Sequence, residues 1–236
     1  MDDEISDSDR VPSSSDSQRF TAALDGLKES GCVVLVTGVV DETVRAAASR
    51  RLFGTPQLPR QRVVVYADDI ALQPASYLPH GIAPDSTSVQ LCEWDSLTRS
   101  DSEDAETKNT HESPTELVVC SGRLTEIITD SEPISNEFVP GEIRVGVLTL
   151  SVIVEEYGRT ATKTFLSVFG QRIQNHHGLL HCHLPIESES TTATALANTV
   201  DIHICLRDQN GSPPEQRWHL RETDCYSRWI PLQLTE

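Results

Sequence analysis

Short apolar runs alternate with segments of helical spacing along most of this chain. A continuous apolar run is typical of a strand buried on both faces of a parallel sheet, whereas apolar residues three and four positions apart predict an amphipathic helix. The predicted strands are 32–36, 62–66, 142–148, 178–184 and a more polar one, nearer a sheet edge, at 88–92. The predicted helices are 20–27, 42–52, 114–130, 151–157, 161–176 and 191–198. This alternation predicts a parallel sheet with helices on both faces.

The C-terminal part of the chain has a different pattern. Three further strands are predicted at 201–206, 217–221 and 228–234, and the turn residues Asn210 and Gly211 lie between the first two. A turn of this kind joins antiparallel strands. The fold class is therefore predicted as an α/β three-layer sandwich, with a mainly parallel sheet that ends in C-terminal antiparallel strands.

Two polar segments interrupt the pattern. Residues 1–17 are rich in serine and aspartate, and residues 95–113 are acidic and rich in serine and threonine. Such composition buries too little apolar surface to order a chain, so both segments are predicted to be disordered. The remainder, 18–236, is predicted to be one domain with the second segment as a loop insertion. Residues 114–130 stay ambiguous between helix and strand, because 117–120 is β-prone and Gly122 weakens a helix.

The charge is strongly acidic. The chain has 36 acidic against 19 basic residues, a net charge of −17, and its only lysines are Lys28, Lys108 and Lys163. An acid excess spread along the whole chain favours a protein that works in molar salt, where the Debye length falls to about 3 Å and like charges are screened. The alternative is an ordinary acidic protein. Either way, this charge argues against non-specific binding to nucleic acid.

Cysteine usage and hydropathy bear on the compartment. The six cysteines form no C-x-x-C motif, and several lie within apolar strand-like runs. The chain begins with acidic, polar residues, and no apolar run approaches the ~20 residues of a membrane span. These features predict a cytoplasmic protein without disulfides or membrane contact.

The turn after the first predicted strand occupies the place of a phosphate-binding loop. Such a loop needs G-x-x-x-x-G-K-[ST], in which glycines let backbone amides wrap the phosphates and lysine adds a positive charge. Gly38 is followed here by two valines, Asp41 and Glu42, with no lysine before Thr43. The small-ligand site that the sequence suggests is a residual anion site at the start of the helix, formed by Thr37, Gly38 and Thr43. The carboxylates of Asp41 and Glu42 would oppose the binding of an anion there.

The layout resembles the RecA/KaiC branch of the P-loop NTPases. Over about 18–234, the chain more closely resembles an uncharacterised family of haloarchaeal proteins described as RecA-superfamily-like or HTR-like. The segments that carry this resemblance are 27–38, 48–54, 140–147, 178–185 and 213–220. The resemblance implies a RecA-like sheet with a degenerate P-loop.

An active relative would also carry an acid at the end of the strand at 143–147, to order magnesium and water. No acid lies between Glu142 and Glu155. Two independent losses predict a protein that is not an enzyme and needs no cofactor. The hypothesis is a catalytically inactive RecA/KaiC-like domain that acts as a regulatory or protein-interaction module in a halophilic archaeon. The alternative is a nucleotide-binding sensor that does not hydrolyse.

Histidines suggest a metal site. His181 and His183 are two positions apart on a predicted strand, so they share one face and could bind one metal ion. A third ligand could be His203 on a neighbouring strand. The alternative is that these imidazoles are hydrogen-bonded within the core.

The remaining candidates concern surfaces. Arg45, Arg50 and Arg51 on the first helix of the sheet, continued by Arg60 and Arg62, form either a docking patch for an acidic protein partner or ordinary surface salt bridges.

Two pairs of residues near strand ends complete the candidates. Asp68 and Asp69 follow a strand, as a ribose-binding acid would, but the glycine pattern of a dinucleotide site is missing. Trp218 and Trp229 on the last strands either pack in the core or line a partner groove.

Overall fold

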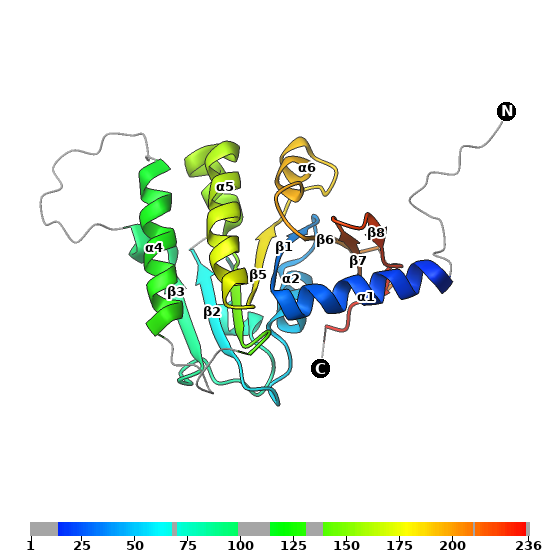
Figure 1. Cartoon of the computed structure of the whole chain (residues 1–236), viewed down its shortest axis with the longest axis horizontal. Coiled ribbons are helices and arrows are strands. Elements are labelled where there is room, and N and C mark those ends of the chain that lie inside the picture. Colours follow the sequence, from blue (N-terminus) through cyan, green and yellow to red (C-terminus); the bar gives the residue numbers. More distant parts are fainter. Residues whose placement is uncertain (1–13, 68–69, 99–113, 131–138, 210, 235–236) are drawn as a thin grey trace, which may run out of the picture.

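A computed structural model describes residues 14–67, 70–98, 114–130, 139–209 and 211–234. Within these ranges the chain forms one nine-stranded, mostly parallel sheet with helices packed on both faces (Figure 1). This architecture confirms the mixed α/β class and is compatible with a three-layer sandwich. Most of the two segments predicted to be disordered, and the pair Asp68 and Asp69, lie outside the described residues.

The strands follow the predicted apolar runs closely. They are β1 (Cys32–Thr37), β2 (Gln61–Tyr66), β3 (Val89–Glu93), β4 (Ile143–Val147), β5 (Leu179–Leu184), β6 (Ile202–Arg207), β7 (Glu215–Leu220), β8 (Cys225–Tyr226) and β9 (Ile230–Pro231). The sheet order is β3-β2-β4-β5-β1-β6-β7-β8, and β9 also pairs with β7. β1 to β6 are parallel, which confirms the parallel part of the prediction, and β3 lies at an edge as expected.

The antiparallel extension was predicted only in part. β7 is antiparallel to β6, as the turn at Asn210 and Gly211 predicts. The predicted last strand, 228–234, is wrong in extent, since only Ile230–Pro231 pairs with β7. Proline has no backbone N–H to donate to a ladder, which fits such a short edge strand. The two-residue strand β8 was not predicted.

The helices are α1 (Ser14–Ser30), α2 (Glu42–Phe53), α3 (Trp94–Thr98), α4 (Pro114–Asp130), α5 (Leu150–Asn175) and α6 (Thr191–Ala197), with a short 3₁₀ helix η2 (Pro74–Tyr77). Helix α4 resolves the ambiguity at 114–130 in favour of helix. Two disorder boundaries are wrong, because 14–17 belong to α1 and 95–98 to α3.

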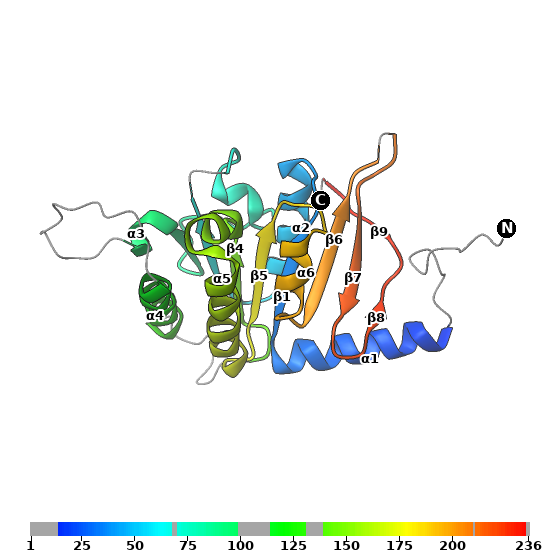
Figure 2. The same cartoon turned by 90° about the horizontal axis from the view of Figure 1, so that it is seen from above.

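The two faces of the sheet carry different helices. We call the α5 face the one covered by α3, α4, α5 and α6, whose side chains share one apolar core with Val33 and Leu35 of β1. We call the α2 face the opposite one, where side chains of α2 meet Val34 and Val36 and those of η2 meet Val64 of β2. Apolar residues of α1 pack against the α2-face core beside β7 and β8 (Figure 2). Alternation along β1 thus fills both cores from one strand.

Helix α5 contains a kink. Gly158 has φ 77° and ψ 164°, which is not helical, so two helical pieces meet there. The prediction of separate helices at 151–157 and 161–176 is confirmed by this break. A positive φ of this kind is accessible to glycine at little cost.

The remaining sequence expectations concern cysteine and membrane. All six cysteines carry free thiols. Among the described helices, none is both long enough and apolar enough to cross a bilayer.

Candidate functional site

The turn after β1 lies at the centre of the sheet, where the connections that follow neighbouring strands leave on opposite faces. β1 lies between β5 and β6, and α2 follows it on one face while α6 follows β5 on the other. In open α/β sheets, ligands bind outside the carboxyl ends of the strands, where successive connections diverge. We therefore call the residues around Thr37, Gly38, Glu42 and Thr43 the β1 edge.

Thr37, the last residue of β1, is fully engaged within the chain. Its buried hydroxyl donates to Ser188 Oγ at 2.7 Å and lies 2.8 Å from His203 Nε2 on β6. Because the hydroxyl hydrogen is given to Ser188, His203 Nε2–H is the donor to Thr37. Burial, helped by His219 and Arg221, lowers the pKa of His203 to about 4, so this imidazole is neutral near pH 7. The structure thus brings Thr37 together with two residues that the sequence did not link to it.

Gly38, which has no side chain, lets the turn pack closely against β6. Its φ is +132°, and a Cβ built there would lie 2.3 Å from the carbonyl oxygen of Leu206. Its N–H donates to the carbonyl of Ile186 at 2.9 Å. Only residues 38–41 separate β1 from α2. This short turn is therefore packed against and hydrogen-bonded to neighbouring segments, and its backbone does not form an open, concave loop.

Glu42 is turned toward the loop that follows β2. Its carboxylate accepts from the backbone amides of Ala71 and Leu72, at 3.0 and 3.1 Å, and from the hydroxyl of Tyr77 at 2.7 Å. Burial of this carboxyl raises its pKa, but the Tyr77, Leu72 and Ala71 hydrogen bonds together outweigh burial, so the pKa of Glu42 is lowered. The carboxylate therefore joins the start of α2 to 71–77, a role that sequence reasoning missed because the partners are backbone amides.

Two other residues of the turn face solvent. Asp41 takes the predicted position just before α2 but makes no side-chain capping hydrogen bond. Asp41 and Thr43 are both exposed. Of the three predicted anion-binding residues, Thr37 and Gly38 are buried and engaged, and only Thr43 is accessible.

His181 and His183 lie on the α2 face of β5, fully buried. His181 Nε2 contacts Ser49 Oγ at 2.7 Å, and its ring meets the edge of Phe53. Neither ring nitrogen of His183 has a hydrogen-bond partner among the residues described by the structure. Burial, with the positive charge of Arg45, lowers the pKa of His183 to about 3.

The expected third metal ligand is wrong. Val34 and Val36 of β1 pair with His181 and His183 on one side and with residues 202 and 204 on the other, so His203 points to the opposite face. An odd shift in strand position reverses the face of a side chain. Across the described ranges, no group of three histidine, cysteine or acidic side chains is placed to hold a metal ion.

The predicted arginine patch is divided by the fold. Arg50 donates to the carbonyls of Ser76 and Leu234, at 2.8 and 2.9 Å. Arg45 is half-buried beside His183, while Arg51 is exposed. Of the three, Arg51 is the one fully presented to a partner.

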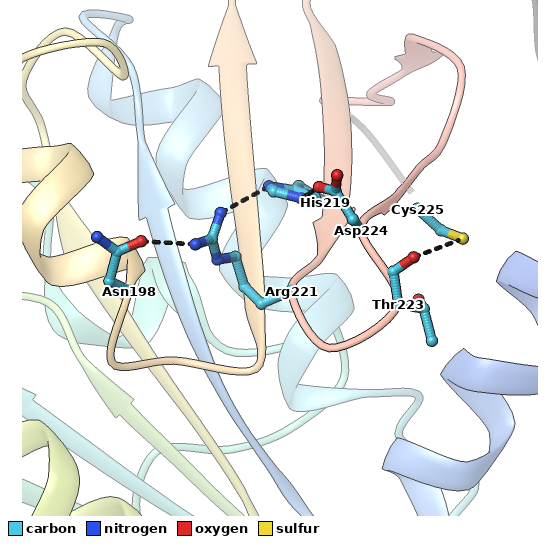
Figure 3. A network of polar contacts seen from close by, with 6 residues as sticks. All are labelled: Asn198, His219, Arg221, Thr223, Asp224 and Cys225. Atoms are coloured by element: carbon cyan, nitrogen blue, oxygen red, sulfur yellow. Dashed lines mark hydrogen bonds and ion pairs between the residues drawn. The ribbon is translucent and has the colours of Figure 1, made fainter.

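A polar network at the antiparallel end of the sheet was also missed (Figure 3). His219 Nε2 lies 2.7 Å from Asp224 Oδ1, and Arg221 donates to Asn198 Oδ1 at 2.5 Å while approaching His219 Nδ1 at 3.4 Å. The His219 ring stacks on Tyr226, with centroids 3.9 Å apart. The network ties the β7–β8 turn to the loop after α6, which is a structural role.

The two tryptophans of the C-terminal part, Trp218 and Trp229, have neighbours of different kinds. Trp218 packs partly buried against the α2-face core. The guanidinium of Arg207 lies over the ring of Trp229, with Arg207 Cζ 3.9 Å from the ring centroid. The core-packing alternative is therefore confirmed for Trp218.

Comparison by sequence gives one family and no characterised relative. Residues 31–206 match the model of a family described as a family of unknown function (DUF7504). No curated protein matches the sequence. The matched part runs from just before β1 into the end of β6, so it covers the parallel strands together with the β1 edge.

Proposed function

Because the chain belongs to the DUF7504 family, which has no known function, we propose its function from its own residues: a catalytically inactive RecA/KaiC-like domain that acts as a regulatory or protein-interaction module. The RecA-like part of this proposal is supported by the layout. A central β1 is followed by a tight turn and a helix, and six parallel strands are extended by antiparallel β7.

The state of the β1 edge carries the proposal. Gly38 is held against Leu206, and the carboxylate of Glu42 stands at the start of α2 with its oxygens bonded to 71–77. A phosphate-binding loop needs free backbone amides in a concave turn, with a positive charge beside them. This turn has a negative charge and a packed backbone instead.

The end of β4 supports the same conclusion. A hydrolase would place a carboxylate there to order magnesium and water. β4 runs instead into Leu148 and Thr149, which are buried, and the Leu148 amide donates to the carbonyl of Val65 at 2.8 Å. These positions serve packing between β4, β2 and α2.

Calorimetry with magnesium-ATP and with ADP, in molar KCl, tests the inactive state. We expect no binding heat and no phosphate release. Micromolar binding that is lost in Thr43→Ala would favour the alternative, a nucleotide sensor. Steady ATP turnover that the same exposed substitution abolishes would refute the proposal.

The interaction role needs a separate test. We expect the tagged chain to retain a protein partner when isolated from its native host in molar KCl. Arg51→Glu should reduce recovery of that partner, because Arg51 is the exposed arginine of the predicted patch. Arg159→Glu, an equal charge change at an exposed position of α5, is the matched control. Equal recovery with both variants would remove Arg51 from the interface.

A further inference from the structure

Three arginines gather at the amino ends of β2 and β4. Arg62 and Arg144 occupy paired positions on these neighbouring strands, so both side chains leave from the α2 face. Adjacent strands are about 4.8 Å apart, and like charges placed opposite each other in a sheet are unfavourable. Arg60 directly precedes β2, and its guanidinium lies over Gly54, where a Cβ would come within 2.8 Å of Arg60 Cζ. We call Arg60, Arg62 and Arg144 the arginine cluster.

The hydrogen bonds of this cluster go to neutral acceptors. Arg62 is 2% exposed, and its two terminal nitrogens donate to the carbonyls of Arg60 and Thr55, each at 3.1 Å. Arg144 donates to the carbonyls of Gly141 and Leu52, at 2.9 and 3.3 Å. None of the ion pairs formed by the described residues includes a member of the cluster.

Several N–H groups of the cluster have no hydrogen-bond partner within the described ranges. These are Arg60 Nε, Arg60 Nη1 and Arg62 Nε, all buried. Burial and the neighbouring charges lower the pKa of Arg62 and of Arg144 to about 10, so each still carries its charge near pH 7. Among the residues that the structure describes, no carboxylate pairs with these three positive charges, in a chain whose net charge is −17.

We propose that Arg60, Arg62 and Arg144 form a binding site for a phosphate group. Guanidinium groups are planar forks whose N–H pairs match the oxygens of an oxyanion, and a tetrahedral phosphate presents oxygens to more than one fork at once. Arg60 is half-buried and directly follows the exposed loop 55–59, so a ligand would approach from this side. The site is at the amino ends of the strands, at the other end of the sheet from the β1 edge, so it does not depend on the proposed function.

The first test is thermal unfolding at constant ionic strength, with KCl replaced stepwise by potassium phosphate. For wild type at a phosphate concentration about 100 times the dissociation constant, we expect the midpoint to rise by roughly 5 °C or more. Arg60→Gln should lose this response. It should still fold, because Arg60 Nε and Nη1 have no hydrogen-bond partner among the described residues that the substitution could remove. Arg51→Gln, an equal charge change at an exposed position nearby, should keep the response.

A general effect of phosphate on proteins would raise the midpoints of wild type and Arg60→Gln equally, and that outcome would overturn the proposal. Equilibrium dialysis with labelled phosphate adds a direct readout. We expect one phosphate per chain, lost in Arg60→Gln and in Arg144→Gln. Competition by glycerol phosphate would identify a phosphate ester as the ligand, and failure to compete would identify free phosphate. Absence of bound phosphate in wild type would refute the site.

Discussion

At the scale of single residues, Gly38 is the position where the turn after β1 tolerates least change. Gly38→Ala would place a methyl group 2.3 Å from the Leu206 carbonyl oxygen, at a positive φ. We expect a loss of about 3 kcal/mol or more in the free energy of unfolding. Gly26→Ala is the control, because a Cβ there meets nothing within 4 Å and lies in helix α1, so it should gain about 0.5–1 kcal/mol. Urea denaturation of both variants checks this, and an unchanged Gly38→Ala midpoint would contradict it.

His183 makes stability depend on pH. Its folded-state pKa of about 3 lies below the value of about 6.5 in an unfolded chain, so the unfolded chain takes up the proton first as pH falls. The contribution of neutral His183 is complete above pH 6.5 and is lost as pH falls toward 3. We expect this proton uptake to lower the free energy of unfolding by about 1.5 kcal/mol between pH 6.5 and 5.

Urea denaturation across this pH range measures the effect. His183→Gln cannot titrate, so its free energy of unfolding should fall less steeply than that of wild type. His80→Gln, at an exposed position, is the matched control and should follow wild type. Parallel curves for wild type and His183→Gln would show that His183 is not buried as a neutral group.

The residues of the β1 edge were only partly predictable. The absence of lysine after Gly38 could be read directly, because a motif is local in sequence. The contact of Thr37 with His203 could not, because it spans 166 positions and depends on β6 lying beside β1. The face of His203 required the register between these strands, which the pattern of apolar residues alone did not supply.

At the scale of elements, the hydrogen bonds of Glu42 connect the start of α2 to the loop between β2 and β3. Glu42→Ala would leave two amides and the Tyr77 hydroxyl without their acceptor. We expect a loss of about 1–3 kcal/mol and faster amide exchange in 70–77. Asp41→Ala is the control. Its side chain makes no capping bond, so it should change stability by less than about 0.5 kcal/mol. Similar amide exchange rates for 70–77 in both variants would show that the Glu42 hydrogen bonds do not hold this loop against α2.

Long, strongly patterned elements were predicted well, and short ones were not. β1 and β2 are buried along nearly their whole length, and each carries a continuous apolar run, at 32–36 and 63–65. β5 is also buried throughout, although His181 and His183 interrupt its apolar residues. The apolar spacing of α1 begins only at Phe20, so the turns before it left no signal. The elements η2, α3 and β8 span two to five residues each, too few for a period to show. Their conformation follows from tertiary contacts, such as those of buried Tyr77 and Trp94.

At the scale of the whole molecule, charge controls the response to salt. With a net charge of −17, like charges repel in the folded state, and salt shortens the range of this repulsion to about 3 Å at 1 M. We expect the unfolding midpoint to rise when KCl increases from about 0.1 to about 2 M. The same increase should have less effect near the sequence pI of about 4.8, where net charge is small. A midpoint that falls with KCl at neutral pH would contradict this prediction.

The position of β1 at the centre of the sheet also sets the order in which the protein can assemble during synthesis. β1 leaves the ribosome early, yet both strands that flank it, β5 and β6, are made last among the parallel strands. At about 5–20 residues per second, the 166 positions between Thr37 and His203 correspond to about 10–30 s of translation. Until β5 is made, this almost entirely apolar strand has no neighbour on either side, and any truncated product that ends before Leu179 retains it as an aggregation-prone edge.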